Sequence, residues 1–78
     1  MNTLLRKARL SRSLTLKQVS ATIETDPANL ARIEIGKQTP KRKVARALYS
    51  FYDGQVPLGG IYDPEFYEST LRSTLELT

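Results

Sequence analysis

The chain has 78 residues, with 12 Lys and Arg against 8 Asp and Glu, and it contains neither Cys nor His. A chain of this length supports one compact domain that buries roughly 60% of the surface its unfolded form exposes. The composition excludes disulfides and thiolate metal sites and removes the commonest general base, so we expect no cofactor, no metal and no hydrolytic activity. The N-terminal MNTLLRKARL interrupts its apolar residues with cations, which argues against a signal peptide or a membrane span and favours a cytoplasmic protein.

Charge is distributed unevenly along the chain. Residues 1–46 hold 11 of the 12 basic residues and three acids, for a net charge of +8, whereas residues 47–78 have a net charge of −4. A basic half joined to an acidic end is typical of a surface that binds a polyanion next to a segment that does not. Taken alone, the same charges are equally consistent with a small domain kept soluble by its cations.

Apolar periodicity and capping signals predict an all-α fold in chain order. The first helix is expected over about residues 3–11, with Asn2 or Thr3 as its cap. Thr15 and Gln18 form a capping box that begins a second helix running to about residue 23. Asp26 followed by Pro27 begins a third helix, and Gly36 supplies the left-handed residue after its end.

The remaining elements follow from the same signals. Thr39 and Pro40 repeat the cap and proline device before a fourth helix, which Asp53 and Gly54 terminate. Residues 55–62 read as a loop or a single weak turn. Asp63 begins a last helix, which Pro64 enters at its first position. We therefore expect one helical domain over residues 1–54 and a C-terminal extension over residues 55–78 that packs on it.

Two short helices joined by a tight turn outline a helix-turn-helix. On the third helix Leu30 and Ile33 define the buried face, so Ala28 and Arg32 point outward. In a major groove Arg32 can donate to guanine O6 and N7, and Ala28 can meet a thymine methyl. Asn29, on the flank, is either an adenine reader or a phosphate contact. Without the surrounding motif, Arg32 would read as an ordinary solvated charge.

Basic residues beside this helix are candidates for phosphate contacts. Lys17 lies in the first turn of the second helix, where free N–H groups already favour an anion. A second group follows the third helix, although the KRK run taken alone is more often a solvated face; this group consists of Lys37, Lys41, Arg42 and Lys43.

The ordered set of these residues resembles the Cro and repressor type of phage helix-turn-helix regulators, also called the xenobiotic-response-element-like family. The match spans about residues 4–54 and rests on LRKAR in the first helix, LTLKQVS at 14–20, Leu30, RIEIGK at 32–37 and Pro40. The resemblance implies a five-helix lambda-repressor-like domain that binds a palindromic double-stranded operator as a dimer, with the third helix in the major groove. It also implies that Thr15 and Lys17 lie against a phosphate and that Arg9 pairs with Glu34.

Three positions depart from the family pattern. Ser20 replaces a small Ala, which packing should tolerate. Glu24 stands where a glycine normally makes the turn, so the backbone either holds a left-handed non-glycine or turns differently. Pro27 occupies a position that often carries a base-reading side chain, which places more of the specificity on the outward residues and on DNA shape.

The C-terminal extension is expected to form a homodimer. All six aromatic residues lie between positions 49 and 67, and so small a core cannot hide them all cheaply. The residues expected at the interface are Tyr62, Phe66, Tyr67 and Leu71. The alternative is that the aromatics only complete the core of the monomer.

Three functional classes follow. The leading interpretation is a transcriptional regulator of Cro size from a phage or mobile element, since we expect no room for a sensor domain. The second is an antitoxin-like or other protein-interaction module that uses the acidic C-terminal segment to bind another protein. A nuclease built around Glu24 and Asp26 is a distant third, because no convergent set of nucleophile or metal ligands accompanies them.

Overall fold

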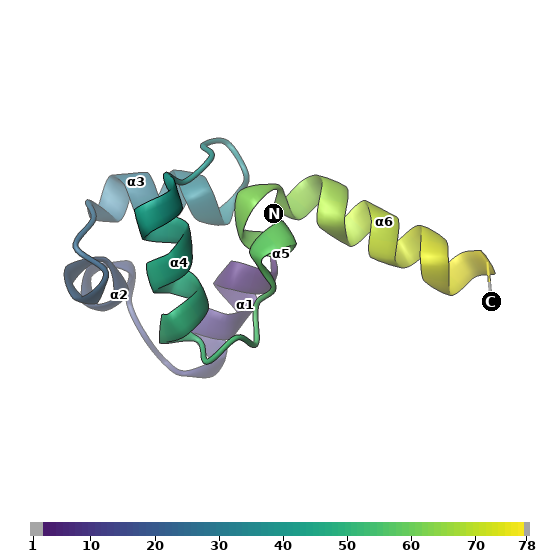
Figure 1. Ribbon diagram of the computed structural model, residues 1–78. Coiled ribbons are helices and arrows are strands. Elements are labelled where there is room, and N and C mark those ends of the chain that lie inside the picture. The colour runs from purple at the N-terminus through teal and green to yellow at the C-terminus, as the bar shows by residue number, and fades with distance from the viewer. Residues whose placement is uncertain (1–2, 78) are drawn as a thin grey trace.

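The computed structural model describes the backbone of residues 3–77 and the side chains of residues 3–71. Every regular element in that range is an α-helix, which confirms the predicted all-α, lambda-repressor-like fold class, and the C-terminal helix follows the five helices that the resemblance implies (Figure 1). The six helices are α1 (Leu4–Ser11), α2 (Leu16–Thr22), α3 (Pro27–Glu34), α4 (Arg42–Phe51), α5 (Leu58–Tyr62) and α6 (Pro64–Leu77). None of these helices is long and apolar enough to cross a membrane.

The first three helices begin at polar caps. Thr3 caps α1 by accepting a bond from the Arg6 N–H at 3.3 Å; the alternative cap, Asn2, lies outside the described residues. Thr15 and Gln18 form the reciprocal capping box of α2, as the sequence predicts. Asp26 accepts a bond from the Ala28 N–H at 2.7 Å and so caps α3.

Helices α1 to α4 all end in the same way. In each, the second residue after the helix has a positive φ, and the N–H of the next residue bonds back to a carbonyl of the last turn, which is a Schellman motif. Only one of the four left-handed positions is a glycine, Gly36 at φ 81°. The others are Ser13 at φ 55°, Glu24 at φ 58° and Asp53 at φ 51°. The sequence predicts the ends at Gly36 and Asp53, and of the two alternatives at Glu24 the left-handed one is correct.

Two sequence expectations are wrong. Helix α4 does not use Thr39 as its cap and Pro40 as its first residue: Lys41 is the cap, without a side-chain bond, and the helix begins at Arg42. The reason is that Pro40 is buried and Lys41 stays extended, so the chain can turn into a helix only after them. Residues 58–62 form the five-residue helix α5, so the loop expected there is wrong and the alternative, a single turn, is closer.

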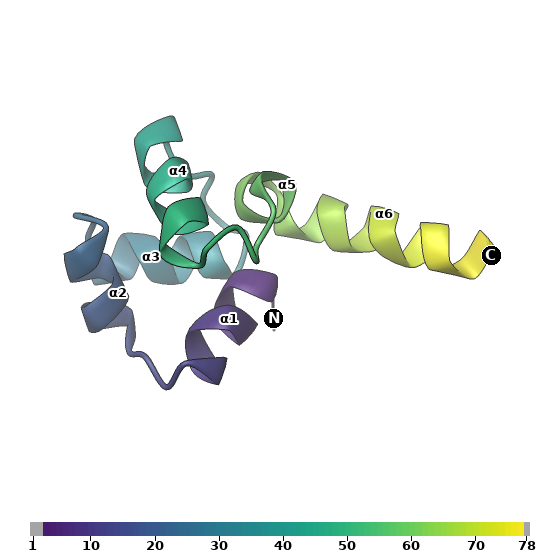
Figure 2. The same ribbon diagram turned by 60° about the horizontal axis from the view of Figure 1, so that its bottom comes forward.

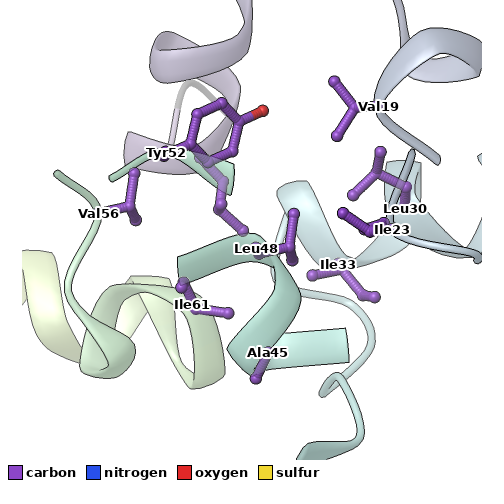
Figure 3. Packing of buried hydrophobic residues seen from close by; sticks show 10 residues of the cluster. Val19, Ile23, Leu30, Ile33, Ala45, Leu48, Tyr52, Val56 and Ile61 are labelled. Atoms are coloured by element: carbon purple, nitrogen blue, oxygen red, sulfur yellow. The ribbon is translucent and has the colours of Figure 1, made fainter. Parts of the chain in front are cut away.

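The core lies among α1 to α5 (Figure 3). Its residues come from every helix of this body and from the segment before α5, and they are Leu5, Val19, Ile23, Leu30, Ile33, Ala45, Leu48, Tyr52, Val56 and Ile61. Val56 and Ile61 lie beyond residue 54, so the C-terminal extension contributes to the same core as the preceding helices. Helix α2 packs against α3, and α5 packs against α1, α4 and α6.

Helix α6 leads away from this body in both ribbon views (Figures 1 and 2). Its start is fixed, since the Asp63 carboxylate accepts from the Phe66 N–H at 3.3 Å and Pro64 is buried. The Tyr67 ring packs over Gly59 and Gly60 of α5, where an added Cβ would lie 3.1 Å and 3.5 Å from ring carbons. Beyond that contact α6 extends into solvent.

Candidate nucleic-acid interface

The α2–turn–α3 unit is held together by its backbone. Glu24 turns the chain after α2, and the Thr25 N–H closes the Schellman motif on the Ser20 carbonyl at 2.9 Å. Asp26 then starts α3 at once. A left-handed non-glycine costs about 1–2 kcal/mol, so the turn is kept tight at some expense in stability.

Helix α3 buries one side and exposes the other. Leu30 and Ile33 are 0% and 2% exposed and belong to the core, which Figure 3 shows them facing. Ala28 and Arg32 are exposed, and Asn29 is half-buried on the flank. The small Ala28 leaves room for another surface to approach the first turn of the helix, and Arg32 places a cation one turn farther along.

The Arg32 guanidinium is hydrogen-bonded to two neighbouring side chains. Its Nε donates to Gln38 Oε1 at 2.8 Å, and its Nη2 donates to Asn29 Oδ1. Asn29 and Gln38 also line one shallow hollow between α3 and the segment that leads to α4. The carbonyl oxygen of Asn29 is therefore engaged with Arg32 in this state of the protein.

The C-terminal end of α3 is anchored to α1. Arg9 donates to both carboxylate oxygens of Glu34, from Nε at 2.8 Å and from Nη2 at 3.1 Å, and Arg9 Nη1 donates to the Leu14 carbonyl at 3.0 Å. Glu34 is only 3% exposed. Its carboxylate therefore forms a buried ion pair and does not face a partner. The Thr3 hydroxyl donates to the Glu34 carbonyl, which fixes the last turn of α3 a second time.

The basic residues that the sequence assigns to phosphates are all exposed. Lys17 lies in the first turn of α2, whose cap Thr15 is exposed too. Lys37 directly follows the left-handed Gly36 after α3, and its N–H closes the motif on the Arg32 carbonyl at 2.9 Å. Lys41 caps α4, and Arg42 and Lys43 begin it.

These cations are not neutralised by acids within the part of the chain whose side chains are described. Over residues 3–71 the Arg9–Glu34 contact is the one ion pair. The first turn of α4 has cations and no acid, although the positive end of the helix dipole favours the opposite arrangement. This distribution of cations does not stabilise the folded chain, but it would attract an anionic partner.

Tyr52 lies behind the ion pair and takes no part in this surface. Its hydroxyl is buried without a hydrogen-bond partner among the described residues. The pKa of Tyr52 is raised to about 12, mainly by burial and to a lesser extent by the Glu34 carboxylate, while the Arg9 and Arg12 guanidiniums oppose the shift. The Arg12 guanidinium stacks 5.1 Å above the ring. Tyr52 is therefore a neutral packing residue at physiological pH.

The four residues expected at a dimer interface differ in their surroundings. Phe66 and Leu71 on α6 are 69% and 46% exposed. Tyr62 and Tyr67 are half-buried, and Tyr67 already contacts the two glycines of α5. The apolar surface left open on α6 thus consists mainly of Phe66 and Leu71.

The acidic residues near this surface do not converge. Among the described residues no group of three or more acids is placed to hold a metal ion. Asp26, one of the two acids considered for a nuclease, has its carboxylate bonded to the α3 N-terminus, and Glu24 points from the turn into solvent.

Sequence reasoning missed two residues of this region. Gln38 carries no local signal, because its contact with Arg32 crosses the end of a helix. Thr3 was expected only as a cap of α1. Its second bond, to α3, depends on how distant helices pack and is not encoded in any local pattern.

One comparison with known proteins identifies a relationship. The sequence model of a family described as helix-turn-helix matches residues 5–56, which is 52 of the 78 residues and includes the whole surface described above except the C-terminal segment. No match was found among curated proteins or among solved structures.

Proposed function

The chain belongs to the helix-turn-helix family of DNA-binding domains, and we propose that it is a cytoplasmic, non-enzymatic repressor that binds a near-palindromic operator. In this proposal α3 lies in the major groove and reads bases through its outer face, with Ala28 and Arg32 facing the bases and Asn29 on the flank. The regulator resembles Cro and belongs to a phage or mobile element.

The observation that carries the proposal is the outward face of α3. Ala28 and Arg32 are exposed while Leu30 and Ile33 anchor the opposite side in the core. An α-helix fits the major groove, where an arginine fork matches guanine O6 and N7 and a small apolar side chain matches a thymine methyl. The base-reading face is therefore short, with Arg32 as its principal donor.

Affinity comes from the surrounding cations in this proposal. Lys17, together with Thr15, contacts the backbone at the start of α2, and Lys37 contacts it beyond the end of α3. Lys41, Arg42 and Lys43 follow the backbone on the far side. Their exposure and their lack of acidic partners over the described side chains support this assignment. Five cations per subunit contribute about −4.5 to the slope of log binding constant against log salt, which gives about −9 for a dimer on its operator.

Dimerisation through the segment 55–78 is the second part of the proposal. Helix α6 stands away from the body and presents Phe66 and Leu71 to solvent, and a second copy would bury them together with Tyr62 and Tyr67. A two-fold dimer places two copies of α3 on half-sites about 34 Å apart, which is one turn of DNA.

Fluorescence anisotropy with labelled 30-base-pair duplexes tests the DNA part. Duplexes are selected from a random pool with the full chain, and binding is measured over a salt series. Lys17→Ala and Lys37→Ala should each weaken binding to every duplex and reduce the salt slope by about 0.9 per subunit. Lys7→Ala, an exposed cation on α1 outside the proposed contacts, is the matched control. A slope near zero, or equal losses for Lys7→Ala, would contradict the proposal.

A further inference from the structure

We propose that Gln38 is a positioning residue that aims Arg32 at guanine, and that Asn29 shares this task rather than reading adenine. The inference rests on the proposed function, since it concerns how the α3 surface reads DNA. It adds a specificity-determining residue that lies outside the recognition helix, in the segment between α3 and α4.

The geometry of the guanidinium carries the argument. Nε and Nη2 form one edge of the planar group, and both donate to amide oxygens, Nε to Gln38 and Nη2 to Asn29. Arginine has five N–H donors in a fixed fork. The other edge, made by Nη1 and the second hydrogen of Nη2, makes no hydrogen bond to the residues that the structure describes. That edge is the one that can donate a parallel pair to guanine O6 and N7.

The amide orientations follow from the same chemistry. A guanidinium only donates, so the atoms of Gln38 and Asn29 that face it must be their oxygens. The Asn29 oxygen keeps a second lone pair, but its bond to Arg32 fixes the direction of the amide. The amide is then not free to turn toward adenine, whose two-point recognition needs a donor at N7 and an acceptor at N6. Its remaining amide hydrogens can still meet a phosphate.

Gln38 can hold Arg32 because its own backbone is anchored. The segment leaves α3 through the left-handed Gly36. This glycine lies against Pro64 of α6, because a Cβ added to it would be 3.4 Å from Pro64 Cγ. The Lys37 N–H closes the turn on the Arg32 carbonyl, and Pro40 is buried two residues after Gln38. The acceptor is therefore presented from a fixed turn and not from a mobile loop.

If an arginine side chain is already held in its binding orientation, the entropic cost of immobilising it upon binding is removed. Ordering one flexible side chain weakens binding by about 2- to 12-fold. The loss should fall on the base that Arg32 reads, because phosphate contacts do not depend on the direction of this guanidinium. A change of base preference with unchanged salt slope is thus the signature of a positioning role.

The experiment uses the full chain and the duplex selected from the random pool, with every base pair of one half-site replaced in turn. Gln38→Met removes the acceptor and keeps the side-chain length, and Gln38→Glu keeps an acceptor. Gln55→Met is the matched control, since Gln55 Oε1 accepts from Arg12 Nη2 at 2.6 Å on another part of the surface. Each variant is also made with Arg32→Ala, and hydrogen exchange of the Arg32 Nε–H is measured by NMR without DNA.

We expect Gln38→Met to reduce the preference for guanine at one position about 2- to 12-fold, to leave the salt slope unchanged and to speed exchange of the Arg32 Nε–H. Gln38→Glu should restore the preference, and Gln38→Met should add nothing in the Arg32→Ala background. Unchanged preference or unchanged exchange would overturn the inference, as would an effect that persists without Arg32, because Gln38 would then touch DNA itself. If Arg32→Ala alters no base preference, the reading role assigned under the proposed function fails first.

Discussion

The buried ion pair between Arg9 and Glu34 makes the sharpest prediction about stability. Replacing Arg9 by Met removes two donors from a carboxylate that is 3% exposed. Removing one partner of a buried pair typically costs about 3–5 kcal/mol, because the other charge remains buried and unpaired. A domain of 78 residues has a free energy of unfolding of about 4–12 kcal/mol, so Arg9→Met should bring the protein close to unfolding.

The reverse substitution and the double variant separate charge from packing. Glu34→Leu should cost less than Arg9→Met, because Arg9 still donates to the Leu14 carbonyl and its long side chain can reach water. In the double variant no charge is buried, and the main loss is the bond to Leu14, which is worth about 1 kcal/mol. We therefore expect the double variant to lie within about 2 kcal/mol of the original protein.

Thermal and urea unfolding followed by circular dichroism measure these differences. At about 4–8 °C per kcal/mol for a domain of this size, Arg9→Met should lower Tm by about 12–40 °C. Lys7→Met, an exposed cation on the same helix, should change the free energy of unfolding by less than about 0.5 kcal/mol. A cost below about 1 kcal/mol for Arg9→Met, or a double variant as unstable as the sum of the two single ones, would refute the reasoning.

Three further predictions concern the turn, the core and α6. Glu24→Gly should raise the free energy of unfolding by about 0.5–1 kcal/mol. The relief of a left-handed non-glycine backbone outweighs the larger conformational entropy that a glycine loses on folding. Destabilisation in urea unfolding would contradict this. Because the pKa of Tyr52 is raised to about 12 in the folded protein from 10 when unfolded, folding binds a proton between those values and stability must fall as pH rises from 10 to 12, by about 2–3 kcal/mol. Tyr52→Phe should lack that part of the alkaline loss, and identical pH profiles of unfolding would refute it. Phe66→Ser with Leu71→Ser should convert a dimer to a monomer in sedimentation equilibrium; an original chain that is monomeric would instead favour a different protein as the partner of α6.

Much of the fold could be predicted because capping residues mark where its helices begin and end. The capping box at Thr15, the Asp26–Pro27 start and the left-handed Gly36 are local devices, and all three occur as predicted. The outward direction of Arg32 followed from helical periodicity alone. These features depend on neighbours within four residues, which is the range that a sequence pattern carries.

The errors arose where tertiary packing decides. Helix α5 contains two glycines and is too short to be stable alone; it forms because Gly60 and Ile61 are buried between α1, α4 and α6. The start of α4 shifted because Pro40 is buried, which no cap rule anticipates. The contact of Arg32 with Gln38 crosses a helix end. Distant residues pack around that end, since the Thr3 hydroxyl bonds to the Glu34 carbonyl and Pro64 of α6 lies against Gly36.

The central claim is that the outer face of α3 meets the edges of bases. The most direct test is an NMR titration of the 15N-labelled full chain with a duplex selected from the random pool. We predict that the largest shifts occur at Ala28 and Arg32, with smaller ones at Lys17 and Lys37 and none along α1. Shifts confined to α6, or a titration that leaves the α3 resonances in place, would contradict the account.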